Sequence, residues 1–308
     1  MEQTLYLECY SGISGDMTVA ALLDLGADEA VLRQVLDSLP LEGFRIEINR
    51  VMKSGIDACD FNVILEDSDN HDHDMEYLYG HMHHKEHAHD AREEAHSHSG
   101  QILHSHTHGH SHETVQIHTD SHTHEHEHHH THSHVHRGMK EIREIIEAGN
   151  MTEGAHSLAL KIFSILAEAE SKAHRVPVEE VHFHEVGAVD SIVDIVAVAV
   201  CLDNLNIKNV IVPELREGKG TVRCQHGILP VPVPAVINIL QAYSLPVQIT
   251  DITGELVTPT GAAVVAAIRT AGSLPLKFTI KKTGLGAGKR EYECPGILRA
   301  MLIEETEG

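Results

Sequence analysis

Residues 4–26 read TLYLECYSGISGDMTVAALLDLG, and this run places a strand pattern directly before a helix pattern. Apolar side chains alternate from Thr4 to Cys9, which predicts a half-buried strand. Ser11 to Asp16 combine two glycines with short polar side chains, as is typical of a turn. Apolar side chains then recur at helical spacing from Met17 to Leu25, and Gly26 predicts the end of the helix. A strand, a turn and a helix in direct succession indicate a fold that mixes both element types.

The same alternation continues along most of the chain. The expected helices span residues 28–39, 139–148, 152–174, 190–204, 234–242 and 258–271. The expected strands span residues 44–51, 60–65, 178–184, 209–213, 247–251, 278–282 and 297–303. The segments 217–227 and 284–290 are rich in glycine and basic residues and are expected to be loops. Interleaved elements predict an α/β or α+β fold with a mixed sheet and packed helices.

Residues 67–136 interrupt this pattern. They hold 24 of the 29 histidines, since only His156, His174, His182, His184 and His226 lie elsewhere. Acidic and hydroxyl side chains make up most of the remainder, and no periodic apolar face is present, which predicts a disordered insertion. The expected organisation is a first part of the folded domain (1–66), the metal-binding insertion (67–136) and the remainder of the catalytic and substrate-binding region (137–308).

Imidazoles occur at every second residue in parts of this insertion, and divalent ions such as nickel favour imidazole nitrogen. The alternatives are a solubilising linker or a cloning tag, but a tag would be terminal and uninterrupted. The histidines expected to bind a divalent metal ion are His104, His106, His108, His110, His112, His122, His124, His126, His128, His130, His132, His134 and His136.

The charge and the cysteine content narrow the class of protein. The chain has 46 acidic and 23 basic residues among 308, a formal net charge of −23, which argues against nucleic acid or an anionic membrane as partner. Neither a signal peptide nor an apolar run approaching the ~20 residues of a spanning helix is visible. Five scattered cysteines without a CxxC motif fit free thiols in a reducing compartment, so a cytoplasmic location is expected.

The segment 181–194 carries the sparsest and most specific set of polar residues. On the expected strand, His182 and His184 would project from one face. On the following helix, Asp190 and Asp194 would lie one turn apart, and this helix is apolar nearly all round. A buried Asp194 costs free energy unless it is paired, hydrogen-bonded or bound to metal. These four residues and Glu185 are therefore the expected catalytic or metal-handling group, the alternative being that Asp190 caps the helix and Asp194 bonds a neighbouring loop.

Four glycine-containing turns could bind an anion through backbone N–H groups, at residues 11–16, 218–227, 258–261 and 284–290. Simpler roles stay open for each, such as helix capping by Asp16 or Thr258 and a solvated turn at 218–227. None of these turns matches a P-loop. The expected substrate-binding residues are Ser14, Gly15, Asp16, Lys219, Arg223, His226, Thr258 and Thr260.

Five motifs in order resemble one protein family. They are SGISGDM (11–17), HFHEVGAVD (182–190), QHGILPVP (225–232), ELVTPTGAA (255–263) and GLGAG (284–288). Their order and wording are similar to the LarC family, the nickel-insertion proteins that complete the nickel-pincer nucleotide cofactor of lactate racemase and related enzymes. The resemblance extends over nearly the whole chain apart from the His-rich insertion.

The resemblance implies a metal-chelatase-type lyase that inserts nickel into pyridinium-3,5-bisthiocarboxylic acid mononucleotide, coupled to CTP hydrolysis with Mg or Mn. It also implies a lactate racemase-type apoenzyme as recipient of the cofactor. Glu8 stands where the family usually has Asp. The family usually continues beyond the position of Gly308 with a further domain that the resemblance assigns to CTP, so a C-terminal partner domain or subunit is expected. A homo-oligomer and a non-enzymatic His-rich nickel chaperone or store stay open as alternatives.

Overall fold

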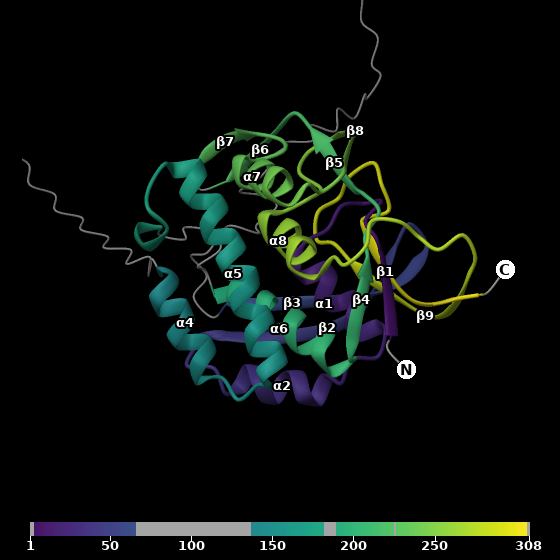
Figure 1. Ribbon diagram of the computed structural model, residues 1–308, viewed down its shortest axis with the longest axis horizontal. Coiled ribbons are helices and arrows are strands. Elements are labelled where there is room, and N and C mark those ends of the chain that lie inside the picture. The colour runs from purple at the N-terminus through teal and green to yellow at the C-terminus, as the bar shows by residue number, and fades with distance from the viewer. Residues whose placement is uncertain (1–2, 66–136, 182–188, 225, 307–308) are drawn as a thin grey trace, which may run out of the picture. The chain divides into compact units, whose positions relative to one another are not determined.

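Figure 1 shows a mixed sheet with packed helices in the computed structural model of the protein, which describes residues 3–65, 137–181, 189–224 and 226–306. The described residues all belong to one compact unit. The predicted insertion 67–136 and the three candidate residues His182, His184 and Glu185 lie outside the described residues.

The main sheet has six strands in the order β2-β3-β9-β10-β1-β4. They are β1 (Gln3–Glu8), β2 (Phe44–Lys53), β3 (Ile56–Leu65), β4 (Ile207–Ile211), β9 (Phe278–Ala287) and β10 (Ile297–Glu305). The pairs β1–β4 and β3–β9 are parallel, whereas the other neighbours are antiparallel. The mixed α/β architecture expected from the interleaved patterns is thus confirmed.

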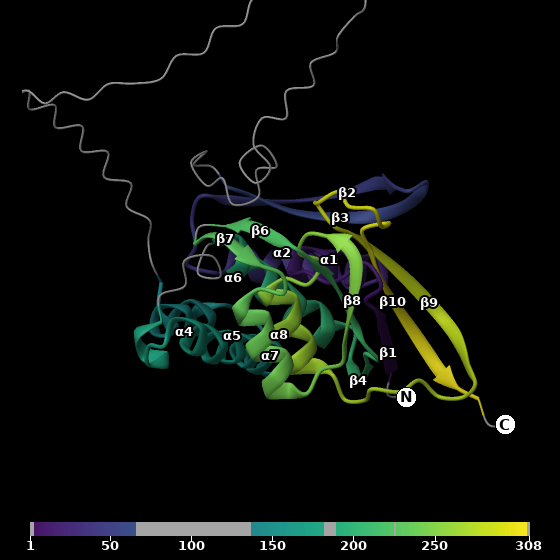
Figure 2. The same ribbon diagram turned by 90° about the horizontal axis from the view of Figure 1, so that it is seen from above.

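Seven α-helices lie in the described part of the chain. They are α1 (Gly15–Asp24), α2 (Glu29–Asp37), α4 (Met139–Ala148), α5 (Glu153–His174), α6 (Val189–Asn204), α7 (Pro234–Tyr243) and α8 (Pro259–Ile268). Helix α1 packs on β3, β9 and β10, α6 packs on α1 and α5, and α5 contacts α7 and α8. Figure 2 shows all of these helices on one side of β2 and β3. Of the helices described, none combines the length and apolar character that a membrane span needs.

Both faces of β1 are covered by other parts of the protein. Leu5 and Leu7 are fully buried in the main core beneath the helices. Tyr6 points to the opposite face, where it packs with Met301 and Ile303 in a second, smaller cluster. Successive side chains of a strand point to opposite faces, so burial of both sets requires that both faces of β1 be covered.

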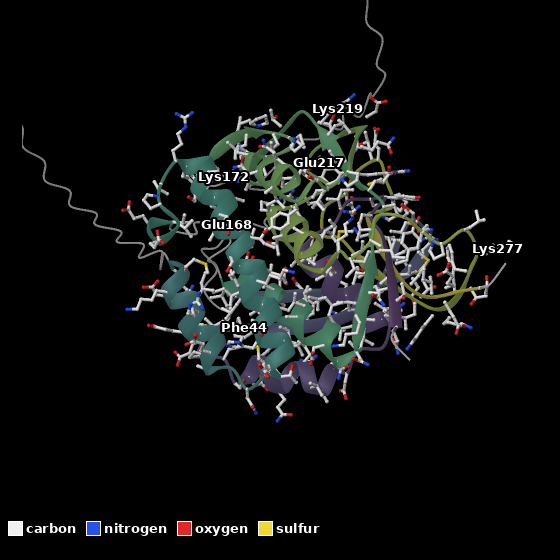
Figure 3. The ribbon with its side chains drawn as sticks, viewed as in Figure 1. Phe44, Glu168, Lys172, Glu217, Lys219 and Lys277 are labelled. Carbon is white, nitrogen blue, oxygen red and sulfur yellow. The ribbon has the colours of Figure 1, made fainter. Side chains whose placement is uncertain are left out.

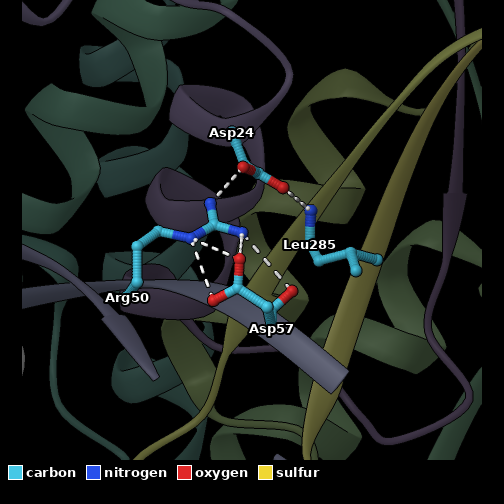
Figure 4. Close-up of polar contacts among 4 residues, drawn as sticks. All are labelled: Asp24, Arg50, Asp57 and Leu285. Atoms are coloured by element: carbon cyan, nitrogen blue, oxygen red, sulfur yellow. Dashed lines mark hydrogen bonds and ion pairs between the residues drawn. The ribbon is translucent and has the colours of Figure 1, made fainter. Parts of the chain in front are cut away.

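A polar clamp joins the β2–β3 hairpin to helix α1 and strand β9 (Figure 4). Arg50 of β2 donates to Asp57 of β3 at 2.7 Å and pairs with Asp24 of α1. The second carboxylate oxygen of Asp24 accepts the backbone N–H of Leu285 at 2.8 Å. Because Arg50 and Asp57 are exposed to solvent, water screens these ion pairs, and the clamp mainly sets the hairpin against α1.

Two local predictions are wrong in the middle of the chain. Residues 178–180 form a short 3₁₀ turn in place of the expected strand, whose remaining residues from 182 lie outside the described part. The expected loop 217–227 contains β5 (Leu215–Lys219), β6 (Thr221–Cys224) and the start of β7 (Gly227–Pro230). Strands β6 and β7 form a hairpin, and β5 pairs in parallel with β8 (Val247–Thr253). Strands β5, β6 and β7 have only four or five residues each, too few for alternation to reveal them.

The expected loop 284–290 is also wrong, since Gly284 to Ala287 belong to β9. A Cβ at Gly286 would lie 2.0 Å from the carbonyl oxygen of Met17, and one at Gly284 would lie 2.2 Å from that of Ala21. These glycines therefore allow the backbone of α1 to approach the sheet closely.

Candidate functional site

A cavity of about 350 Å³ lies where the first turns of α1, α6 and α8 meet the end of α5 and the β6–β7 hairpin. Seven of the eight expected substrate-binding residues and two of the five expected catalytic residues line it. From the expected substrate-binding set these are Ser14, Gly15, Asp16, Arg223, His226, Thr258 and Thr260, and from the expected catalytic set Asp190 and Asp194. Four of the five motifs (11–17, 182–190, 225–232 and 255–263) thus contribute residues to one site.

Lys219 is the predicted residue that the structure places elsewhere. Its ammonium group donates to Asp251 at 2.7 Å, and both side chains are largely exposed. Figure 3 labels Lys219 near Glu217 on β5, at the margin of the molecule in that view. His182, His184, Glu185 and the tract histidines lie outside the described residues, so their predicted roles stay predictions.

Backbone pairing brings the starts of α1 and α8 together. The N–H of Ile13 donates to the carbonyl of Leu256 at 2.9 Å, and the N–H of Thr258 donates to that of Ile13 at 3.1 Å. A Cβ at Gly261 would lie 2.2 Å from the Ile13 oxygen, so this approach requires glycine. Two helix N-termini, each with a partial positive charge, consequently face the same cavity.

The caps of these two helices differ. The Thr258 hydroxyl accepts the N–H of Gly261 at 3.1 Å, which is ordinary capping, and Thr258 lines the cavity as well. The N-cap of α1 is Ser14, not Asp16, so the capping role considered for Asp16 is wrong. Ser14 makes no capping bond with its side chain and its hydroxyl donates to Asp16 instead. Asp16, in the first turn of α1, therefore places a carboxylate at this helix end.

Asp194 lies against the first turn of α1. A Cβ at Gly15 would lie 2.5 Å from the Asp194 Oδ2 atom and 2.9 Å from its Cβ, so the carboxylate occupies the space that a side chain at Gly15 would need. Asp190, one turn earlier on α6, is 8% exposed. The partial positive charge of the α1 N-terminus stabilises a carboxylate at this position. Two carboxylates on one face of an otherwise apolar helix thus reach the cavity.

The cations of the cavity differ in how far they are neutralised. Arg290 donates to Glu255 at 2.7 Å, and although burial acts in the opposite sense, the Glu255 charge raises the pKa of Arg290 overall. Lys289 pairs with Asp60 of β3. Arg223 is exposed and forms no ion pair with any residue that the structure describes. Arg223 is therefore the cation best able to receive an anionic ligand.

A group of residues at the other end of the cavity was not predicted from the sequence. His174 and Glu170, from the last turn of α5, and Cys224 of β6 line it together with His226. The His174 and His226 rings lie 5.0 Å apart, centroid to centroid. No local signal marked His174, because a polar residue at the end of an amphipathic helix is ordinary. Within the described ranges, no three His, Cys, Asp or Glu side chains converge as a ready set of metal ligands.

Glu217 lies behind the cavity and organises one of its walls. Its side chain is fully buried, and its Oε1 atom accepts the N–H groups of Gly218 and Leu256 at 2.7 Å and of Val257 at 3.2 Å. Its Oε2 atom is buried without a hydrogen-bond partner among the described residues. Burial raises the pKa of Glu217 to about 7 although the three N–H groups act in the opposite sense. This carboxyl holds the segment that carries Glu255 and Thr258.

The five cysteines are free thiols, as the sequence predicted. Burial raises the pKa values of Cys9 and Cys201 to about 12, so these two thiols stay protonated at neutral pH. Cys224 and Cys294 are the two that are partly exposed. Of these, Cys224 lines the cavity.

Comparison with known proteins gives the family. The chain matches the nickel insertion protein family over residues 5–308. It is 49% identical over 306 residues to a pyridinium-3,5-bisthiocarboxylic acid mononucleotide nickel insertion protein of Alkaliphilus metalliredigens, covering 99% of this chain and 62% of that protein. Proteins of the same name from Clostridium acetobutylicum and Acetivibrio thermocellus are 41% identical over 302 residues and 36% over 304, each covering 98% of this chain and 64% and 61% of those proteins.

The chain thus spans about three fifths of the length of these curated relatives. No solved structure matches it. A family match over almost every residue, with the family's motifs gathered around one cavity, leads to one conclusion: this chain belongs to the nickel insertion protein family.

Proposed function

We propose that the cavity binds a thiocarboxylated pyridinium mononucleotide and that nickel is inserted into this nucleotide there. The observation that carries the proposal is the convergence of four separate motif regions, which bring an arginine, two helix N-termini and two carboxylates to one cavity. The names of the relatives supply the substrate, pyridinium-3,5-bisthiocarboxylic acid mononucleotide. The chain would act within a longer protein or with a separate partner domain, as the lengths of its relatives suggest.

The charge balance of the cavity supports a monophosphate better than a triphosphate. Arg223 and the N-terminus of α8 offer positive potential for one phosphate group, whereas the carboxylates of Asp16 and Asp194 already lie at the N-terminus of α1. Lys289 and Arg290 are already paired with carboxylates. A triphosphate carries more negative charge than these groups offset, so we infer that CTP binds elsewhere. The CTP dependence of the family is therefore assigned to a site elsewhere in the active protein.

Asp190 and Asp194 have a chemical role in this proposal. Bonding nickel to a ring carbon of the pyridinium replaces a proton on that carbon, and a nearby carboxylate can accept the proton. Oxygen and imidazole donors are also suitable ligands for a divalent ion in transit. His182, His184 and Glu185, which precede α6 in the chain, are proposed to act with these two aspartates. The substitution Asp194→Asn keeps the shape and removes the charge, and we expect it to lower the insertion rate about 100-fold or more.

The non-enzymatic alternative, a nickel chaperone or store, is favoured by the His-rich insertion alone. It requires no nucleotide site. Nucleotide binding by the nickel-free chain therefore distinguishes the two, and calorimetry with the thiocarboxylated mononucleotide measures it directly. Arg223→Gln should weaken this binding about tenfold or more, because a charge-assisted contact to phosphate is lost. Lys219→Gln is the matched control, since Lys219 comes from the same glycine-rich segment and faces Asp251.

Insertion itself is tested by incubating the chain with nickel, the mononucleotide, CTP and manganese. Parallel reactions contain or omit the separately produced C-terminal part of the Alkaliphilus relative. Mass spectrometry of the released nucleotide detects the nickel adduct. A product that forms only with both parts supports the proposal. Nucleotide binding with no product under either condition would assign the chain to substrate capture and contradict insertion at this cavity.

A further inference from the structure

Two imidazoles face each other at the solvent-exposed margin of the cavity. His174 is the last residue of α5, and His226 lies in the turn that joins β6 to β7. Both side chains line the cavity and both residues are exposed, so an ion can reach them from solvent. Their ring centroids are 5.0 Å apart and the ring planes are tilted by 39°. Elements far apart in the sequence thus bring two metal-binding side chains together.

The spacing of the rings suits one shared ion. Imidazole binds divalent transition metals through nitrogen at about 2.0–2.1 Å, which places each ring centroid about 3.2 Å from the ion. When the nitrogen–metal–nitrogen angle lies between a right angle and the tetrahedral angle, the centroids of the two rings are about 4.5–5.2 Å apart. The observed 5.0 Å falls in this interval. The separation of the two rings is therefore compatible with one shared ion.

A carboxylate stands beside one of the rings. The Oε2 atom of Glu170 is 3.4 Å from the Nε2 atom of His174, one helical turn away on α5. A carboxylate next to one ring nitrogen favours the proton on that nitrogen and leaves the other as a metal ligand. A carboxylate in this position can orient the His174 ring, as carboxylates commonly do beside metal-binding histidines.

We propose that His174 and His226 form an entry point for nickel, where the ion is held before it passes to the nucleotide bound in the same cavity. This inference rests on the proposed function, because the nucleotide is the acceptor. An ion that must leave needs few protein ligands and open coordination positions. The described residues supply this pair and no converging set of three ligands. The open positions can accept thiocarboxylate sulfur, a donor that nickel also binds, so the ion can transfer by ligand exchange.

The entry point lies at a different depth from the two aspartates. His174 and His226 are exposed, whereas Asp190 is 8% exposed and Asp194 lies against Gly15. An ion arriving from solvent would therefore meet the imidazoles first and the carboxylates afterwards. This order separates capture of the ion from its insertion.

Metal-catalysed oxidation tests the pair in the full chain, because mass spectrometry of peptides separates these two histidines from those of the tract. Cu²⁺ serves as the probe, since it prefers the same imidazole ligands, and ascorbate drives oxidation of the bound histidines. We expect oxidation of both His174 and His226 and protection of both by added Ni²⁺. His174→Gln should lower oxidation at His226 about tenfold, because a shared ion loses half of its protein ligands.

His156→Gln is the matched control, because His156 lies on the same helix and does not line the cavity. It should leave oxidation at His174 and His226 unchanged. Full oxidation at His226 in the His174→Gln protein would overturn the inference, as would a failure of Ni²⁺ to protect either residue in the wild type. The wild-type protection experiment decides the question even if a variant fails to fold. Nucleotide binding without paired protection would remove the entry point and leave the proposed function intact.

Discussion

At the scale of single residues, the contact between Gly15 and Asp194 links helix α1 to helix α6. Gly15→Ala should lower the free energy of unfolding by about 1–3 kcal/mol, because the new methyl group would overlap the carboxylate. Adding Asp194→Gly to this variant removes the overlapping atoms, so the combined loss should be clearly smaller than the sum of the two single losses. Urea unfolding of the four proteins measures this coupling. Additive losses would mean that the two residues do not compete for the same space.

Glu217 should make the stability of the protein depend on pH. Burial raises its pKa to about 7 from an ordinary value of 4.5, so between these values the folded state keeps a proton that the unfolded chain has released. The stabilisation is present in full below pH 4.5 and is lost as the pH rises through 7. The whole shift corresponds to about 3 kcal/mol.

Glu217→Gln removes the titration and keeps an acceptor for the three N–H groups. We expect the decline in the free energy of unfolding from pH 5 to pH 8 to be flatter in this variant than in the wild type. Glu214→Gln, which changes a more exposed carboxylate at the start of the same segment, should keep the wild-type slope. Equal slopes for all three proteins would show that Glu217 is ionised in the folded state at pH 5.

At the scale of elements, the packing of α1 on β9 depends on glycine. Gly286→Ala places a methyl group 2.0 Å from the Met17 carbonyl oxygen, and neither backbone can yield easily. We expect a loss of about 1–3 kcal/mol in stability and weaker nucleotide binding, since α1 carries Ser14 to Asp16. Gly288→Ala is the control, because its methyl group would meet the flexible Met17 side chain at 3.0 Å. Similar melting temperatures for both variants would contradict this account.

At the scale of the whole molecule, the composition of residues 67–136 predicts that this segment binds most of the nickel but contributes little to the stability of the fold. Replacing this segment with a short glycine–serine linker should greatly lower the number of nickel ions bound per chain. The melting curve of the metal-free protein should stay nearly unchanged, because the segment has no periodic apolar face to contribute to a core. Equilibrium dialysis with Ni²⁺ and circular dichroism measure the two quantities. A large fall in melting temperature would show that the segment supports the fold.

Nickel held by this segment should be released as the pH falls through about 6, since imidazole binds the ion and imidazolium does not. Nickel retention is measured from pH 7.5 to pH 5 on the full chain and on the chain without residues 67–136. The difference between the two gives the nickel held by this segment. Retention that does not change over this interval would point to carboxylates or thiolates as the ligands.

Local periodicity was enough to predict β1, α1, α6 and most other elements, because burial of one face imposes a repeat on the sequence. The five motifs were enough to predict the family, and side-chain chemistry was enough to select nine of the residues that line the cavity. The strand residues Gly284 to Ala287 were wrongly predicted to be a loop. In a sequence, glycines that allow a helix to pack closely cannot be distinguished from glycines of a loop.

Only the tertiary structure could show which of these residues share a site. Lys219 and Arg223 are only four residues apart in the sequence, but they lie in different places. Lys219 lies on β5 and faces Asp251, whereas Arg223 lies on β6 and lines the cavity. The tertiary structure also paired His174 with His226 across different elements. Such contacts depend on how distant segments pack. The periodicity of apolar residues indicates only which face of its own helix or strand each residue occupies.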